Sequence, residues 1–140
     1  MNFAFSQEQA ELKRGARRFL AASCGIAQVR SAMAGASGVD RAAWAQACEL
    51  GWPGLVIPEA LGGAGLGWVE LVAIAEETGR SLACLPFFST VCLGANALVA
   101  AGDAAHLPRI ASGEVTATLA FGEDAAADVG CIATVAREDA

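Results

Sequence analysis

Apolar residues recur at helical spacing through most of the first hundred positions of this chain. In the first such run, between residues 7 and 22, they stand at i, i+4, i+7 and i+8: Leu12, Ala16, Phe19 and Leu20. This spacing places them on one face of an amphipathic helix. Ser6 followed by Gln9 is the pattern of a capping box, which begins a helix. The sequence therefore predicts a first helix over residues 7–22 with one buried stripe.

The same reasoning predicts further helices over residues 26–33, 41–50 and 68–79. Asp40 is a suitable N-cap for the second of these, and Gly51 ends it. The inner stripe of the third is expected to consist of Trp68, Leu71, Val72 and Ala75. Three acidic side chains of this helix are expected on its solvated face: Glu70, Glu76 and Glu77. Glu76 and Arg80 are spaced to pair at i, i+4.

Residues 87–101 are apolar on almost every side, so they predict a helix in the interior, begun by Pro86 and ended by Gly102. After Gly113 the period changes from 3.6 to 2. Val115, Ala117, Leu119 and Phe121 then alternate with smaller or polar residues, which predicts a strand, and a second short strand is predicted over residues 131–137. Two strands are marginally stable alone. We therefore expect a helical domain over residues 1–112 and the start of a β-domain over residues 113–140, truncated at the end of the chain.

The connector between the second and third long helices carries five glycines and two prolines. Glycine tolerates positive φ and proline fixes φ, so this composition predicts a loop with one defined path. The N-terminal signature of the acyl-CoA dehydrogenase family is similar to this stretch, which reads Gly51-Trp52-x-Gly54-Leu55-x-x-Pro58-Glu59-x-x-Gly62-Gly63-x-Gly65, followed by Glu70-Leu71 and Glu76-Glu77-x-Gly79-Arg80.

This resemblance implies a mostly α fold, namely the N-terminal helical domain of that family followed by the first one or two strands of its middle β-domain. Members bind FAD between the β-domain and a C-terminal helical domain, and oxidise the Cα–Cβ bond of an acyl thioester. A carboxylate removes the α-proton while the β-hydride passes to the flavin. In most members that glutamate lies in the C-terminal domain, so no residue of this chain is assigned as catalytic. Glu59 is interpreted as a turn or cap carboxylate.

Two sets of positions are carried over from the family. Its flavin-contacting strand end is an aromatic or small residue followed by Thr/Ser-Glu-Pro, which corresponds here to Phe121-Gly122-Glu123-Asp124. Phe121, Gly122 and Glu123 are the candidate flavin-binding residues, with Gly122 in place of the hydroxyl and Asp124 in place of the proline. The family's acyl pocket is partly formed by the start of the buried helix, here Phe87, Phe88, Ser89 and Thr90. The two phenylalanines narrow a straight-chain tunnel or form a flat wall for a ring; the alternative is that both belong to the core.

The composition excludes several classes of binding partner. A net charge of -6 and a pI of 4.6 argue against nucleic acid and anionic membranes as partners. No apolar run approaches the roughly 18–20 residues of a membrane span, and the N-terminus is too polar for a signal peptide. Five cysteines without a CxxC pair indicate a reducing cytoplasm and no metal site.

Three hypotheses for function follow. The first is the N-terminal part of an FAD-dependent acyl-CoA dehydrogenase of lipid metabolism, inactive alone and with FAD absent or at low occupancy. Its partners are an acyl-CoA, an electron-transfer acceptor, and further subunits in a homo- or hetero-oligomer (dimer or tetramer). The second is a flavin-deficient subunit that pairs with a catalytic partner, since the flavin motif is degenerate. The third is a helical interaction module without catalysis.

Overall fold

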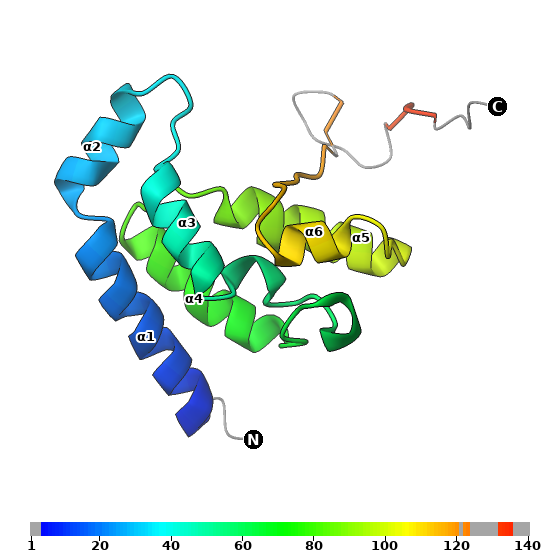
Figure 1. Cartoon of the computed structure of the whole chain (residues 1–140), viewed down its shortest axis with the longest axis horizontal. Helices are drawn as coiled ribbons and strands as arrows, with labels where there is room; N and C mark the ends of the chain where they lie inside the picture. The colour runs from blue at the N-terminus through cyan, green and yellow to red at the C-terminus, as the bar shows by residue number, and fades with distance from the viewer. Residues whose placement is uncertain (1–3, 121, 124–131, 136–140) are drawn as a thin grey trace.

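The computed structural model describes residues 4–120, 122–123 and 132–135, and this part consists of helices and loops (Figure 1). The α-helices are α1 (Gln7–Ser23), α2 (Ile26–Ala34), α3 (Arg41–Glu49), α4 (Trp68–Arg80), α5 (Asn96–Ala101) and α6 (Leu107–Ala111). Two 3₁₀ helices, η1 (Trp52–Gly54) and η2 (Glu59–Leu61), lie in the loop between α3 and α4. A π-helix, η3 (Phe88–Ala95), runs directly into α5. The mostly α class is confirmed.

α1 begins at the predicted capping box. Ser6 Oγ accepts a hydrogen bond from the Gln9 N–H at 3.1 Å, and Gln9 Oε1 accepts one from the Ser6 N–H at 2.9 Å. The helix packs along α4, and together with α3, η1 and η3 these two helices enclose the larger core (Figure 1). The buried residues of this core are Ala16, Leu20, Cys24, Ala43, Trp44, Ala47, Trp52, Leu55, Leu71, Ile74, Phe87 and Val91.

The predicted inner stripe of α4 is partly wrong. Trp68 and Val72 are 66% and 49% exposed, whereas Leu71 and Ile74 face α1 and the core. The reason is that α4 is apolar at so many successive positions that two overlapping stripes fit a period of 3.6. The pattern alone does not say which stripe the neighbouring helix covers.

Glu77 was also wrongly expected on the solvated face: its side chain is 1% exposed. Arg17 of α1 binds it with two hydrogen bonds of 3.0 and 2.7 Å, and Arg80 donates a third at 2.8 Å. The predicted pair of Glu76 with Arg80 is replaced by this arrangement, and Glu76 pairs instead with Lys13 of α1. Helical spacing within α4 could not reveal these bonds, because two of the three partners come from another helix.

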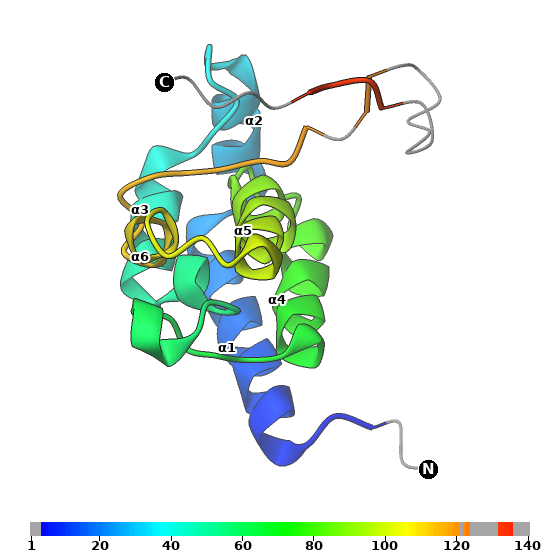
Figure 2. The same cartoon turned by 90° about the vertical axis from the view of Figure 1, so that its right-hand side faces the viewer.

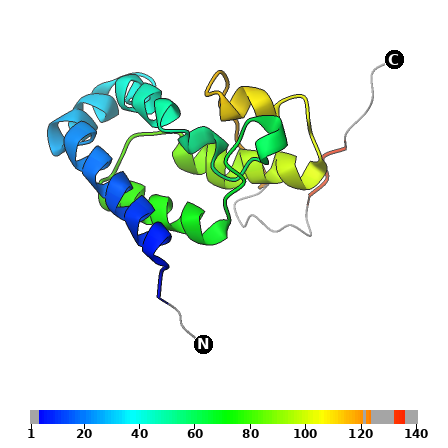
Figure 3. The ribbon, with the colours of Figure 1, turned by 60° about the horizontal axis from the view of Figure 1, so that its bottom comes forward.

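The loop between α3 and α4 follows one path, as its composition predicts. Gly51, Gly62 and Gly65 have positive φ, and the loop folds back on itself through main-chain bonds from Ala64 to Gly54 and from Leu66 to Leu55. It packs between η3 and α6, as Figure 3 shows. A smaller core lies beneath it, formed by Ile57, Ala95, Leu107 and Ile110.

The long apolar helix predicted over residues 87–101 is present but divided. Its first half is the π-helix η3, where Val91 and Ala95 are fully buried. Its second half, α5, contains no buried residue. The expectation of burial on all sides therefore fails for α5, and Phe88 at the start is 65% exposed.

No strand is formed in the part of the chain that the structure describes, so the expected strands are not observed. Residues 114–120 are non-helical, and Val115 and Ala117 are half-buried while Thr116 and Thr118 are exposed. This alternation matches the predicted period of two as far as Thr118, but Leu119, which was expected on the same side as Ala117, is 43% exposed. A ladder requires a neighbouring strand, which the described residues do not supply. Of the second expected strand, residues 132–135 are described and are not in a strand; the rest lies outside the described residues.

Among the described helices, none is long and apolar enough to cross a bilayer. The four described cysteines are free thiols: Cys24, Cys48, Cys84 and Cys92. Burial raises the pKa of the thiols of Cys24, Cys48 and Cys92, so these three side chains act as small apolar groups.

Candidate functional site

Phe87 and Phe88 border one cavity at the C-terminal end of α4. Its volume is about 340 Å³, and its wall consists of Ala75, Thr78, Gly79, Leu82, Ala83, Leu85, Phe87 and Phe88. Phe87 is 1% exposed and packs edge-on against Trp52 at a centroid distance of 5.6 Å, so it belongs to the core as well as to the wall. Phe88 is 65% exposed and offers its ring to the cavity.

The cavity also owes its shape to Leu82. The C-terminus of α4 ends with N–H bonds from Leu82 to Gly79 O and from Ala83 to Thr78 O, which is the Schellman pattern. Leu82 occupies the left-handed position of this motif with φ of 51°, where glycine is usual. The result is an apolar side chain, 65% exposed, at the edge of the cavity.

Ser89 and Thr90, the other two residues carried over for the acyl pocket, do not line this cavity. The Ser89 hydroxyl donates to Pro86 O at 3.2 Å within the same turn. Thr90 is fully buried, and its Oγ1 accepts a hydrogen bond from the Ala117 N–H at 3.3 Å. Thr90 therefore joins η3 to the extended segment that follows α6, which Figure 2 shows crossing over η3 and α5.

Two of the three candidate flavin-binding residues lie in the described part of the chain, Gly122 and Glu123, whereas Phe121 lies outside it. The Glu123 carboxylate accepts hydrogen bonds from the N–H groups of Ala133 and Thr134, at 2.7 and 2.8 Å, and from the Thr134 hydroxyl. These bonds, first of all that of the hydroxyl, lower the pKa of Glu123. Both carboxylate oxygens are thus engaged within the chain, which leaves the main chain at Gly122 as the group open to a ligand.

The π-helix and the residue that sustains it were missed from the sequence. The Asn96 side-chain amide donates to Val91 O at 2.9 Å and to Cys92 O at 3.2 Å, where the π-helix changes into α5. These bonds satisfy carbonyls that the change of helix type would leave without a partner. The only signal in the sequence was an asparagine within an apolar run.

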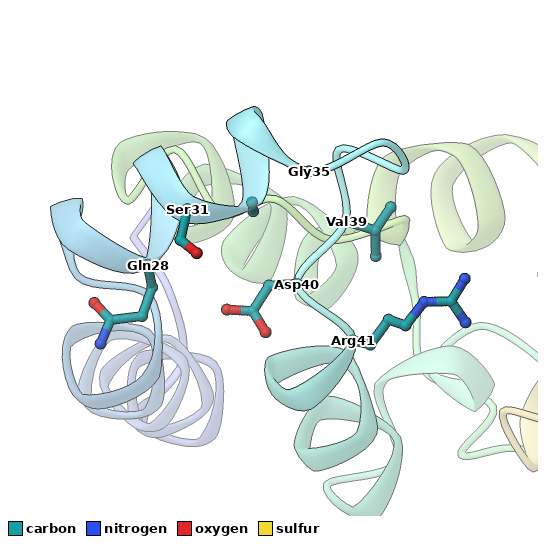
Figure 4. A pocket seen from close by; sticks show the side chains of 7 residues that line it. Gln28, Ser31, Gly35, Val39, Asp40 and Arg41 are labelled. Atoms are coloured by element: carbon teal, nitrogen blue, oxygen red, sulfur yellow. The ribbon is translucent and has the colours of Figure 1, made fainter.

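Two other cavities have a carboxylate in their walls. One, of about 320 Å³, lies between α2 and the start of α3. Its single carboxylate, Asp40, accepts from the Ala43 N–H at 3.0 Å as the helix cap, and Figure 4 shows the Arg41 side chain extending away from it. The other, of about 450 Å³, lies between α5, α6 and residues 115–119 and is bordered by Asp103 and His106.

Asp103 and His106 pair through Oδ2 and Nδ1 at 2.9 Å, but Asp103 Oδ1 also caps the turn before α6. The N–H and the ring of His106 lower the pKa of Asp103. This arrangement is that of a capping aspartate, and nothing in it orients the histidine toward a nucleophile. Within the described residues, no group of three or more potential ligands could hold a metal ion.

Residues 6–114 match the sequence model of a known domain, the N-terminal domain of acyl-CoA dehydrogenases. Over 121 residues, or 84% of its length, the chain is 36% identical to the acyl-CoA dehydrogenase IpdE2 of Mycobacterium tuberculosis, of which it covers 38%. It is also 36% identical over 97 residues, 65% of its length, to the (2S)-methylsuccinyl-CoA dehydrogenase of Cereibacter sphaeroides, covering 18% of that protein.

Solved structures give the same result for the fold. The ChsE4–ChsE5 complex of Mycobacterium tuberculosis superposes with a TM-score of 0.81 at 26% identity, over 89% of this chain and 35% of the other. A variant of the Tcur3481–Tcur3483 steroid ACAD superposes with a TM-score of 0.77 at 31% identity, over 84% and 33%. The chain thus spans less than two fifths of the length of the proteins it matches.

Proposed function

The chain belongs to the acyl-CoA dehydrogenase family, and on this premise we propose that it is the N-terminal part of an FAD-dependent enzyme that oxidises the Cα–Cβ bond of an acyl-CoA thioester. The observation that carries the proposal is the match over residues 6–114 to the N-terminal domain of that family. The relatives named above support it, since they are acyl-CoA dehydrogenases by name.

In this proposal, residues 1–112 are the helical domain and residues 113–140 lead into a middle β-domain. Two features support the boundary. α6 ends at Ala111, and Gly113 turns the chain away from the helices with φ of 77°. The alternating burial of residues 114–118 supports a strand at the start of the proposed β-domain.

The residues present fit FAD through the main chain only. Gly122 has no side chain to offer, and the carboxylate of Glu123 is satisfied by residues 133–134. We therefore assign the flavin contact to the main chain of Phe121 and Gly122. Glu123 is assigned a structural role, in which its carboxylate joins residues 122–123 to residues 133–134. Bound FAD supplies the acceptor for the hydride that leaves the substrate.

The cavity bordered by Phe87 and Phe88 is proposed to receive part of the acyl group. No titratable side chain lines it, so its role is to bind apolar surface and exclude water, and the base belongs elsewhere. The exposed ring of Phe88 favours a flat, ring-containing acyl group over a straight chain. The similarity to a steroid ACAD supports the same choice.

A second candidate is a subunit that lacks flavin and pairs with a catalytic partner, in the cytoplasm as the free thiols favour. Gly122 in place of a hydroxyl favours it, as does the likeness to structures with two named components, ChsE4–ChsE5 and Tcur3481–Tcur3483. A hetero-oligomer that passes electrons to a separate acceptor is compatible with both candidates.

The test uses the complete gene product that carries this chain. Purified protein is expected to show the visible absorbance of oxidised flavin, and a ring-containing acyl-CoA is expected to bleach it. Protein without flavin that gains activity only with a co-expressed partner supports the second candidate. Protein without flavin, activity or such a partner leaves a non-catalytic module.

Substrate choice is tested with Phe88→Ala. The specificity constant for a ring-containing acyl-CoA is expected to fall about tenfold, because the contact between the Phe88 ring and the acyl ring is lost. The specificity constant for a short straight-chain substrate should change little. Trp68→Ala is the matched control, since Trp68 is equally exposed but lies away from this cavity. Equal losses for both substrates would contradict the assignment of Phe88.

A further inference from the structure

One face of the π-helix η3 holds the segment that leads to Gly122, and we propose that Thr90 and Gly94 are positioning residues for the flavin contact. The inference rests on the proposed function. Thr90 then lies not in the acyl pocket, where the resemblance placed it, but at the contact between the helical domain and the segment that leads to Gly122.

The first contact is a hydrogen bond. Thr90 is fully buried, and its hydroxyl oxygen lies 3.3 Å from the Ala117 N–H, which donates to it. The segment around Ala117 forms no ladder in the described residues, so no neighbouring strand accepts a hydrogen bond from this N–H. A buried hydroxyl that binds a main-chain N–H of another segment fixes that segment at one point.

The second contact is a close approach. Gly94 lies four residues after Thr90, on the same face of the helix. A Cβ at Gly94 would lie 2.7 Å from the Ala117 Cβ and 3.0 Å from its carbonyl carbon. Only a glycine at this position lets the segment lie directly on the helix, so Thr90 and Gly94 form a two-point seat for Ala117.

The π-helix keeps the seat in shape. Asn96 donates to the carbonyls of Val91 and Cys92, between Thr90 and α5, and so stabilises the wide turns at this place. Single π-turns are uncommon and often occur at functional sites. Residues 117–120 lie outside any helix, and Gly122 and Glu123 follow closely along the chain, so we expect a displacement at the seat to shift the candidate flavin contact.

The test compares Thr90→Val, which keeps the shape and removes the hydroxyl, with Thr90→Ser, which keeps the hydroxyl. Both are made in the complete gene product. Thr90→Val should weaken FAD binding roughly two- to tenfold, as the loss of one ordinary hydrogen bond does, and Thr90→Ser should restore it. The matched control is Thr116→Val, the same change at an exposed neighbour of Ala117.

A second readout is amide exchange in the peptide that spans residues 115–120, measured by mass spectrometry. Thr90→Val should speed this exchange while thermal unfolding and exchange in α1 and α4 stay as in the parent. Gly94→Ala should have a larger effect on both FAD affinity and exchange, because its Cβ meets backbone atoms. Adding Ala117→Gly to Gly94→Ala should recover part of the loss.

The outcomes are distinct. FAD affinity that is unchanged in Thr90→Val and Gly94→Ala, in a parent that binds FAD, overturns the positioning role and leaves the proposed function standing. A loss that Thr90→Ser does not restore, or that Thr116→Val shares, also overturns it. A parent that binds no FAD overturns the proposed function and this inference with it.

Discussion

Among the residues that the structure describes, Glu77 is the buried charged side chain, and its free energy of burial depends on Arg17 and Arg80. Their hydrogen bonds, that of Arg17 first, lower the pKa of Glu77 from 4.5 to about 2 despite the opposing effect of burial. Both arginines remain about half exposed and can return to water when the carboxylate is removed. Removing the charge should therefore lower the free energy of unfolding by about 2 kcal/mol, which is less than for a fully buried ion pair.

Glu77→Gln should accordingly lower the free energy of unfolding of the 140-residue chain by that amount at pH 7, measured with urea. The folded pKa lies below the unfolded value, so the contribution of the charge is complete above pH 4.5 and is lost as the pH falls toward about 2. Parent and variant should therefore converge over this range. Glu76→Gln is the control: the Glu76 side chain is 54% exposed, so removing its charge should cost under about 0.5 kcal/mol.

Leu82 has an unfavourable backbone conformation for a residue with a side chain. A left-handed conformation costs a non-glycine residue about 1–2 kcal/mol, and Leu82 recovers little of this by burial. Leu82→Gly should therefore raise the stability of the chain by about 0.5–1 kcal/mol, as measured by thermal unfolding. If the cavity binds the acyl group, the same change should weaken substrate binding. Greater stability with unchanged binding would remove Leu82 from the site.

At the scale of elements, the loop between α3 and α4 depends on the absence of a side chain at Gly63. A Cβ there would lie 2.0 Å from the Ile57 carbonyl oxygen, which is main chain and cannot rotate away. Gly63→Ala should cost about 3 kcal/mol or leave the chain unfolded in urea titration. Gly15→Ala, within α1 where nothing lies within 4 Å, should instead stabilise by about 0.5–1 kcal/mol. A Gly63→Ala protein as stable as the parent would show that the loop has room to move.

The elements that were predictable are those whose signals are local. The capping box at Ser6, the Asp40 cap and the stop at Gly51 act within a few residues, and all three are found in the structure. The inner face of α4 and the partners of Glu77 depend on where α1 packs, which the spacing within α4 does not contain. The π-helix was not predicted either, because an apolar composition does not distinguish a π-helix from an α-helix.

For the candidate site, the resemblance to the family indicated which residues to inspect, and the structure shows what those residues contact. Phe87 and Phe88 reach a common cavity, which the spacing of two adjacent residues did not require. Thr90 differs: its partner, Ala117, lies in a segment whose course no local pattern could give. Residues that join distant segments are the part of a site that a single sequence conceals.

At the scale of the whole molecule, the cavity bordered by Phe87 and Phe88 has no titratable side chain in its wall, so it offers no base. The 140-residue chain alone should therefore not reduce an electron acceptor with any acyl-CoA, and should retain FAD poorly after desalting. Circular dichroism would show that the protein tested is helical and cooperative in melting. Turnover by the folded chain alone would mean that a carboxylate of this chain is the base.

The polar contacts between α1 and α4 have a consequence for how the two helices are aligned. Gln9 meets Glu70, Lys13 meets Glu76 and Arg17 meets Glu77, so both helices run in the same direction. Apolar stripes alone would tolerate a slide of one helical turn, about 5.4 Å. Such a slide separates Arg17 from the buried carboxylate of Glu77. In one direction it brings Lys13, which lies one turn earlier in α1, toward Glu77, but an ammonium does not reproduce the two parallel hydrogen bonds of the guanidinium. The three pairs therefore favour a single register between α1 and α4.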